Sequence, residues 1–112
     1  MYYAEFITKV HFRAKNSEVE MKIIDQCRDK IVTAYWVSLS QQIRDILPCS
    51  SDEIETAMDV MESEILDYLS GKTAAEIINY VSNQPGEWFY RVELIQRDFL
   101  DSIEEANEEA EA

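Results

Sequence analysis

Glycine and proline are scarce in this chain, with two residues of each among 112. The tight turns of hairpins and sandwich corners use glycine, asparagine and proline, and an all-β domain of this length would need several of them. The shortage therefore argues against an all-β fold and favours a fold dominated by helices. Pro48, Gly71 and the Pro85-Gly86 pair instead mark the few places where a helix is expected to end.

Residues that carry catalysis or bind metals are also scarce. His11 is the only histidine, which excludes a bundle site built from two Glu-x-x-His motifs, and two isolated glycines cannot form a phosphate-binding loop. No calcium-binding loop is present. We therefore expect no enzymatic activity, no cofactor and no metal site. Cys27 and Cys49 are the only cysteines, and both thiols are expected to be free and buried.

Long apolar runs are absent as well. No stretch approaches the roughly 18 apolar residues that a membrane span needs, and the N-terminal residues do not have the pattern of a signal peptide. We therefore expect a cytoplasmic protein. Hydrophobic residues make up 46% of the chain and aromatic residues 11%, which supports a packed core. We expect one globular domain over residues 1–103 and an acidic tail over residues 104–112 that frays.

Basic residues are nearly missing from the second part of the chain. Residues 1–44 carry seven Lys/Arg and five Asp/Glu, a net charge of +2, whereas residues 45–112 carry three Lys/Arg and eighteen Asp/Glu, a net charge of −15. A charge of this density repels itself, and most soluble domains avoid it. It also repels nucleic acids and anionic membranes, so direct binding to either is not expected. The expected partner is a basic protein.

The N-terminal half contains segments that fit either a strand or a helix. In residues 2–14 apolar and charged residues alternate, and although a helical stripe also fits, the β-branched and aromatic content favours a strand. Residues 18–24 alternate in the same way and could complete a hairpin, but Ser17 and Glu20 form a capping box that slightly favours a helix from Ser17. The predicted fold class is mainly α, with α+β as the alternative: a compact helical domain with a small N-terminal strand or hairpin element.

The second half has clearer helix signals. Ser51 is expected to cap a helix that extends to about Leu69, with an apolar face made of Ile54, Met58, Met61, Ile65 and Tyr68. Thr73 and Glu76 form a second capping box, which opens a short helix through about Ser82. A strong turn signal over residues 83–86 precedes a final helix, whose apolar stripe is Phe89, Val92, Gln96, Phe99 and Ile103.

Acidic residues form a row on each of two predicted helices. The first row is Asp52, Glu55, Asp59 and Glu62, and the second is Asp98, Asp101, Glu105 and Glu108. The first row places a carboxylate about every 5 Å along the helix axis, whereas one strand of DNA carries a charge about every 3.4 Å. Residues 52–71 contain seven acids and no base, so this helix gains no Glu–Lys pairs. The alternative interpretation is a solvated face that only keeps the protein soluble.

Two classes of binding protein use such a surface. In size, charge and acidic tail the chain resembles nucleic-acid mimics, small phage or plasmid proteins that block the DNA channel of a restriction enzyme, a CRISPR effector or another nucleic-acid-binding protein. No motif carries this resemblance. The eight acids of the two rows would then stand in for phosphates. The alternative is an acidic adaptor, chaperone or immunity protein that binds one basic protein. Homodimerisation through the N-terminal half is a further alternative.

Three consecutive aromatic residues, Trp88, Phe89 and Tyr90, open the final predicted helix. One face of a helix cannot bury all three. Phe89 fits the apolar stripe, so Trp88 and Tyr90 are expected to be partly exposed, as candidate aromatic anchors beside an acidic rim. The alternative is a broad contact in which they belong to the core.

Overall fold

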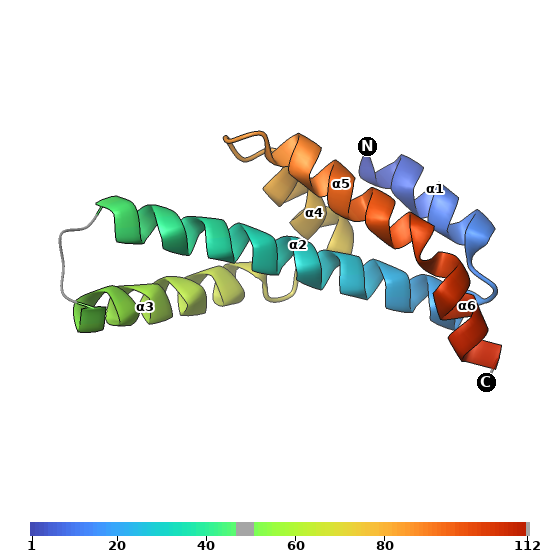
Figure 1. Cartoon of the computed structure of the whole chain (residues 1–112), viewed down its shortest axis with the longest axis horizontal. Coiled ribbons are helices and arrows are strands. Elements are labelled where there is room, and N and C mark those ends of the chain that lie inside the picture. Colours follow the sequence, from blue (N-terminus) through green and yellow to red (C-terminus); the bar gives the residue numbers. More distant parts are fainter. Residues whose placement is uncertain (47–50, 112) are drawn as a thin grey trace. The chain divides into compact units, whose positions relative to one another are not determined.

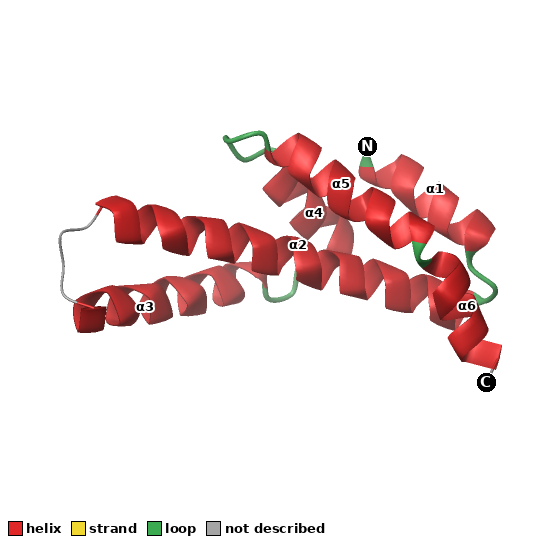
Figure 2. Ribbon diagram, viewed as in Figure 1, coloured by secondary structure: helices red, strands yellow, loops and turns green. Residues whose placement is uncertain are grey.

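The structure is a computed structural model that describes residues 1–46 and 51–111 (Figure 1). Every regular element in these residues is a helix (Figure 2). The helices are α1 (Tyr3–Arg13), α2 (Ser17–Ile46), α3 (Ser51–Leu69), α4 (Ala74–Ser82), α5 (Trp88–Asp101) and α6 (Ile103–Glu111). The prediction of a mainly α fold is confirmed. None of these described helices is both long and apolar enough to span a membrane.

The chain divides into two compact units. The first unit comprises Met1–Val32 and Thr73–Ala112, and the second comprises Thr33–Lys72. The first unit therefore contains α1, the N-terminal part of α2, and α4 to α6, while the second contains the rest of α2 and the whole of α3. The sequence predicts one domain over residues 1–103 and does not predict this division.

The prediction of a strand or hairpin at the N-terminus is wrong, because residues 3–13 form α1. A strand that buries Phe6 and Val10 would also bury Phe12, which lies on the same side at every second position. In the structure Phe6 and Val10 are fully buried and Phe12 is 82% exposed. Burial at a spacing of four residues is the helical pattern, so packing of this stripe overrides the β-propensity of the segment.

Helix α2 is capped by Asn16, one residue before the predicted cap at Ser17. The Asn16 side-chain oxygen accepts a hydrogen bond of 3.0 Å from the Val19 N–H, and the Asn16 carbonyl accepts another of 3.1 Å from the Glu20 N–H. Asn16 therefore acts as the N-cap, and Ser17 is the first helical residue. The helix from this point is confirmed, and the hairpin alternative for residues 18–24 is excluded.

A contiguous set of apolar side chains forms the core of the first unit. Helix α1 contacts α4, α5 and α6, and α5 contacts α4 and α6. All thirteen buried hydrophobic residues of the described chain belong to this unit: Phe6, Val10, Val19, Ile23, Cys27, Ile31, Ile77, Ile78, Val81, Trp88, Val92, Leu100 and Ile103. Cys27 is free and buried, as predicted. Cys49 lies outside the described residues, as does Pro48.

Helix α4 and the turn after it follow the prediction closely. The Thr73 hydroxyl accepts a hydrogen bond of 3.2 Å from the Glu76 N–H, so Thr73 is the N-cap of α4. Gly86 has a φ of 96°, and Glu87 has a φ of 65°, the one positive value among the described residues other than glycine. Because a glycine tolerates this region at little cost, the turn can lead directly into α5.

The last helical segment is divided at Ser102, which lies between α5 and α6. Its amide N–H lies 3.2 Å from the Asp98 and Phe99 carbonyls. The Asn107 side chain accepts a hydrogen bond of 2.8 Å from the Lys15 N–H and donates one of 3.0 Å to the Arg13 carbonyl. The acidic tail thus forms a helix attached to the loop between α1 and α2. Fraying at the end of this helix remains a prediction.

Among its described residues, the second unit has few buried side chains. Helix α3 covers Ser51–Leu69, so Ser51 is its first residue and not the cap before it, while the predicted end near Leu69 is confirmed. Gly71, with a φ of 79°, follows the helix in the left-handed conformation typical of a helix end. Its apolar face is only partly covered, since Ile54, Met58, Met61 and Ile65 are all half-buried. The only buried residue among the unit's described residues is Ser40, whose hydroxyl donates to the Trp36 carbonyl at 2.9 Å.

Candidate acidic docking surface

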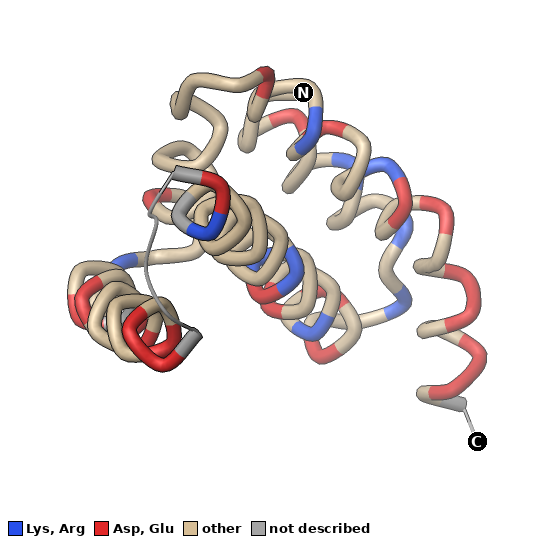
Figure 3. The backbone as a smooth tube through the Cα atoms, turned by 60° about the vertical axis from the view of Figure 1, so that its left-hand side comes forward, with Lys and Arg blue, Asp and Glu red and all other residues tan. Residues whose placement is uncertain are grey.

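The first predicted row of acids lies on α3 in an exposed position. All seven acids of this helix are exposed: Asp52, Glu53, Glu55, Asp59, Glu62, Glu64 and Asp67. Figure 3 shows acidic positions recurring along the chain, and no basic position falls within α3. Among the described residues, Glu55, Asp59 and Glu62 make no ion pair. Lys72, the next base along the chain, lies with its Nζ atom 4.7 Å from the centre of the Tyr68 ring. The charges of these three carboxylates are therefore not balanced by an ion pair in the described part of the chain.

The second predicted row is exposed too, but basic residues lie beside it. It runs along α5 and α6 as Asp98, Asp101, Glu105 and Glu108. Arg13 lines a surface hollow together with Asp101 and Glu104. Lys22 lines another with Glu105, and the Lys22 Nζ atom lies 3.5 Å from a Glu109 oxygen. The field of this row is therefore partly cancelled by cations from α1 and α2.

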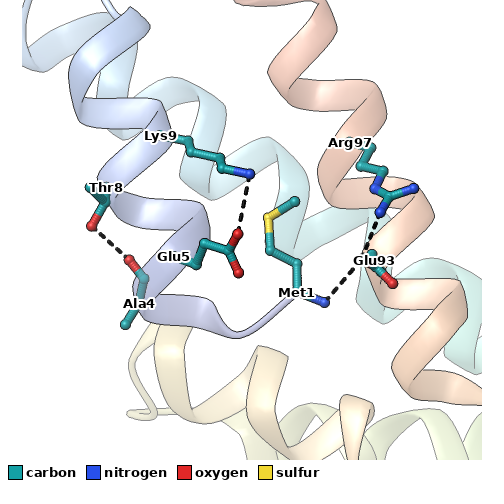
Figure 4. Close-up of polar contacts among 7 residues, drawn as sticks. All are labelled: Met1, Ala4, Glu5, Thr8, Lys9, Glu93 and Arg97. Atoms are coloured by element: carbon teal, nitrogen blue, oxygen red, sulfur yellow. Dashed lines mark hydrogen bonds and ion pairs between the residues drawn. The ribbon is translucent and has the colours of Figure 1, made fainter.

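Other acids of the first unit are paired in the same way. The Lys9 Nζ atom lies 3.2 Å from a Glu5 oxygen, and an Arg97 guanidinium nitrogen lies 3.0 Å from a Glu93 oxygen (Figure 4). The Arg28 guanidinium lies 3.1 Å from Asp29. These exposed pairs contribute little to stability, but they reduce the local negative potential. The first row belongs to the second unit, and the second row belongs to the first unit.

Only one of the two predicted aromatic anchors is accessible. Trp88 is 4% exposed, and the Arg91 guanidinium lies 4.9 Å from its ring centre. The expected exposure of Trp88 is therefore wrong. The reason is that α5 buries a face on which residues recur every four positions: Trp88, Val92, Gln96 and Leu100. The predicted stripe began at Phe89 instead. Tyr90 is 65% exposed, as expected, and its ring meets that of Phe89 edge to face at 5.7 Å.

An apolar notch on α3 was not predicted from the sequence. The described residues that line it are Asp52, Glu53, Thr56, Ala57, Val60 and Met61. Val60 is 54% exposed, although it lies in the middle of the helix. The signal in the sequence is a valine outside the apolar stripe and surrounded by acids. The notch shows that α3 offers apolar contact in addition to charge.

Groups suited to metal binding do not come together in the described part of the chain. Burial raises the pKa of the Cys27 thiol to about 12, so this thiol stays protonated and unreactive at neutral pH. His11 is exposed, with its Nδ1 atom 3.2 Å from a Glu20 oxygen. Within residues 1–46 and 51–111 no three His, Cys, Asp or Glu side chains are placed to hold a metal ion.

Comparisons of the chain with protein-family models, with curated proteins and with solved structures find no match. The residues and their arrangement are therefore the basis for assigning a function.

Proposed function

We propose that this protein is a non-enzymatic acidic inhibitor that occupies a basic groove of a nucleic-acid-processing protein and competes there with DNA or RNA. The observation that carries the proposal is the row Asp52, Glu55, Asp59 and Glu62, exposed on α3 in a helix that contains no base. On this proposal these carboxylates take the place of phosphates. The row of α5 and α6 contributes less, because Arg13 and Lys22 lie beside it.

The physical basis is the long-range field of the unpaired carboxylates. Like charges at spacings of three and four residues destabilise a helix by a few tenths of a kcal/mol each. A surface of one sign also accelerates association with a surface of the other sign, and this effect weakens as salt is added. The acid row thus destabilises the helix on which it lies. Binding to a basic partner would compensate for this cost, which would explain why the row is present.

The test begins with capture of basic proteins from the native host at low and at moderate salt, identified by mass spectrometry. Displacement of a fluorescent DNA duplex from the captured protein is then measured by anisotropy. The wild-type chain should compete with the duplex, and competition should weaken as salt increases. Neutralising three acids of the row in Glu55→Gln/Asp59→Asn/Glu62→Gln should weaken competition about tenfold, in steps of about 0.5 kcal/mol per acid.

A matched control separates the row from the total charge. Glu18→Gln/Asp25→Asn/Asp29→Asn removes the same charge from exposed positions of α2. This variant should change competition less than threefold. Equal losses in both variants, or no loss in the α3 variant, would contradict the proposal.

A second candidate is an acidic adaptor, chaperone or immunity protein with one basic partner. The exposed Tyr90 and Leu94, one turn apart on α5 and one turn before Asp98, favour this function. Such a protein should not displace DNA, and it should lose most of its affinity in Tyr90→Ala. Trp88→Ala is unsuitable for this test because Trp88 lies in the core.

A further inference from the structure

The second unit is left with exposed apolar residues that its own helices do not cover. Between Thr33 and Lys72 no described hydrophobic side chain is fully buried, whereas the first unit buries thirteen. Val37 and Val60 are 52% and 54% exposed. Single exposed apolar residues are ordinary, but a helix with no fully buried described side chain lacks the packing that normally stabilises it. A partner that covers this surface would supply that packing.

The notch on α3 has a defined pattern along the helix. Glu53, Ala57, Val60 and Glu64 follow one another at spacings of four, three and four residues, so they lie along one line of the helix surface. Asp52 lies beside Glu53 at one end and Asp67 lies one turn beyond Glu64 at the other. The distance along the axis from Glu53 to Glu64 is about 16 Å. An apolar floor thus lies between two groups of carboxylates.

This pattern selects one kind of occupant. We infer that the notch receives an apolar side chain of a basic amphipathic helix in the partner, with Lys or Arg residues on both sides of that side chain pairing with the carboxylates at the two ends. The inference rests on the proposed function, in that the partner is a basic protein, and it adds a hydrophobic contact to the electrostatic one.

Charge decides against the other occupants. A second copy of α3 would bring seven more acids to the same surface, and a nucleic acid or an anionic membrane would be repelled in the same way. A helix that places apolar anchors in a groove and charges at its rim is a common mode of protein recognition. The basic helix is the one occupant that satisfies both the floor and the rim.

The test uses a synthetic helical peptide about 18 residues long, with two leucines on one face and arginines one to two turns before and after them. Two further peptides replace the leucines by serine or the arginines by glutamine. Binding to the full chain is measured by fluorescence anisotropy. The first peptide should bind, and each of the other two should bind at least about fivefold more weakly, as expected for loss of part of a buried aliphatic side chain or of several charge pairs.

The matched protein variants are Val60→Ser and Val37→Ser. The two valines have nearly the same exposure in the same unit, but Val37 does not line the notch among the described residues. Serine and valine have similar helix propensities. Val60→Ser should weaken binding of the leucine peptide about fivefold to tenfold, and Val37→Ser less than twofold. Far-UV circular dichroism verifies that both variants keep their helix content.

The outcomes distinguish this inference from the proposed function. Equal peptide affinities of Val60→Ser and Val37→Ser, or no preference for the leucine peptide, would contradict the proposed binding at the notch. Neither result would contradict the proposed role of the acid row. Loss in Val60→Ser with no loss in Glu55→Gln/Asp59→Asn/Glu62→Gln would support the notch and contradict the competition with nucleic acid. A dimer in analytical ultracentrifugation that Val60→Ser dissociates would show that a second copy covers the notch, which also overturns the inference.

Discussion

The two units of this chain use the same kind of amphipathic helix with different results. In the first unit, helices α1, α2, α4, α5 and α6 together bury thirteen hydrophobic side chains. In the second, α3 has an apolar stripe of similar regularity, yet Ile54, Met58, Met61 and Ile65 stay half-buried. An apolar stripe therefore shows which face of a helix can be buried, and the number of neighbouring elements decides whether it is. The apolar stripe of α3 therefore keeps exposed apolar surface.

Charge follows the same division. Residues 33–72 carry eight acids and two bases, a net charge of −6 over 40 residues, while the other 72 residues carry a net charge of −7. In the first unit many acids lie beside a base, as Glu5 does with Lys9 and Glu93 with Arg97. The unit with the weaker core thus also has the higher charge density, and both properties oppose its stability in isolation.

The largest expected difference concerns equal truncations in the two units. Ile78→Ala removes a side chain that is 1% exposed in the first unit and should lower the free energy of unfolding by about 2–5 kcal/mol. Ile65→Ala removes the same atoms from a half-buried site in the second unit and should cost about 1 kcal/mol. Each unit has one tryptophan, Trp36 or Trp88, so fluorescence of Trp36→Phe and Trp88→Phe backgrounds follows each unit separately in urea.

A common unfolding midpoint for both tryptophans would break the comparison, because it would mean that the two units unfold as one. A lower urea midpoint for the fluorescence of Trp36 than for that of Trp88 would show that the second unit is the less stable one.

The next largest expected effect concerns a buried polar side chain in the first unit. Gln96 is fully buried, and neither its amide nitrogen nor its amide oxygen has a hydrogen-bond partner among the described residues. Gln96→Met keeps the volume and removes the uncompensated polar atoms, so it should raise the free energy of unfolding by about 1–2 kcal/mol. The exposed Gln42→Met should change it by less than about 0.5 kcal/mol. Urea denaturation measures both, and destabilisation by Gln96→Met would show that the amide has a role in the native state.

The smallest expected effect concerns the repulsion between Asp59 and its neighbours Glu55 and Glu62 on α3. Asp59→Lys places a base four residues after Glu55 and three before Glu62, replacing two repulsions by two attractions. Stability should rise by about 0.5–1 kcal/mol at low salt, and the gain should disappear near 1 M salt, where the Debye length is about 3 Å. Glu105→Lys on α6 should give no such gain, because Lys22 already lies beside it. Equal gains from both substitutions would contradict the difference between the rows.

Helices with strong local signals were predictable from the sequence. The cap at Thr73, the turn at residues 83–86 and the stripe of α3 each depend on neighbouring residues, and all three are present in the structure. The helix in the N-terminal segment was not predictable, because its β-branched and aromatic residues fit both the strand and the helix periodicity. The exposure of Tyr2 and Phe12 outside the core separates the two interpretations. This exposure depends on the packing of α1 against elements far away in the sequence, such as α4, α5 and α6.

The candidate site was predictable in part for the same reason. The acids of α3 follow from helix geometry alone, so the row Asp52, Glu55, Asp59 and Glu62 lies on α3 as expected. Trp88 precedes Val92 by four residues and Gln96 by eight, so helix geometry places it on their face, although the predicted stripe began at Phe89. The bases beside the second row come from α1 and α2, far away in the sequence. The sequence pattern of one helix contains no information on such neighbours.

The Asn107 side chain joins α6 to backbone atoms of Arg13 and Lys15, which precede it by 94 and 92 residues. Helix α1 also contacts α4, α5 and α6. During synthesis these contacts can form only after residues 74–111 have been translated. Completion of the core around Phe6 and Val10 is thus expected to follow the synthesis of α6, even though every helix of the first unit can begin to form locally.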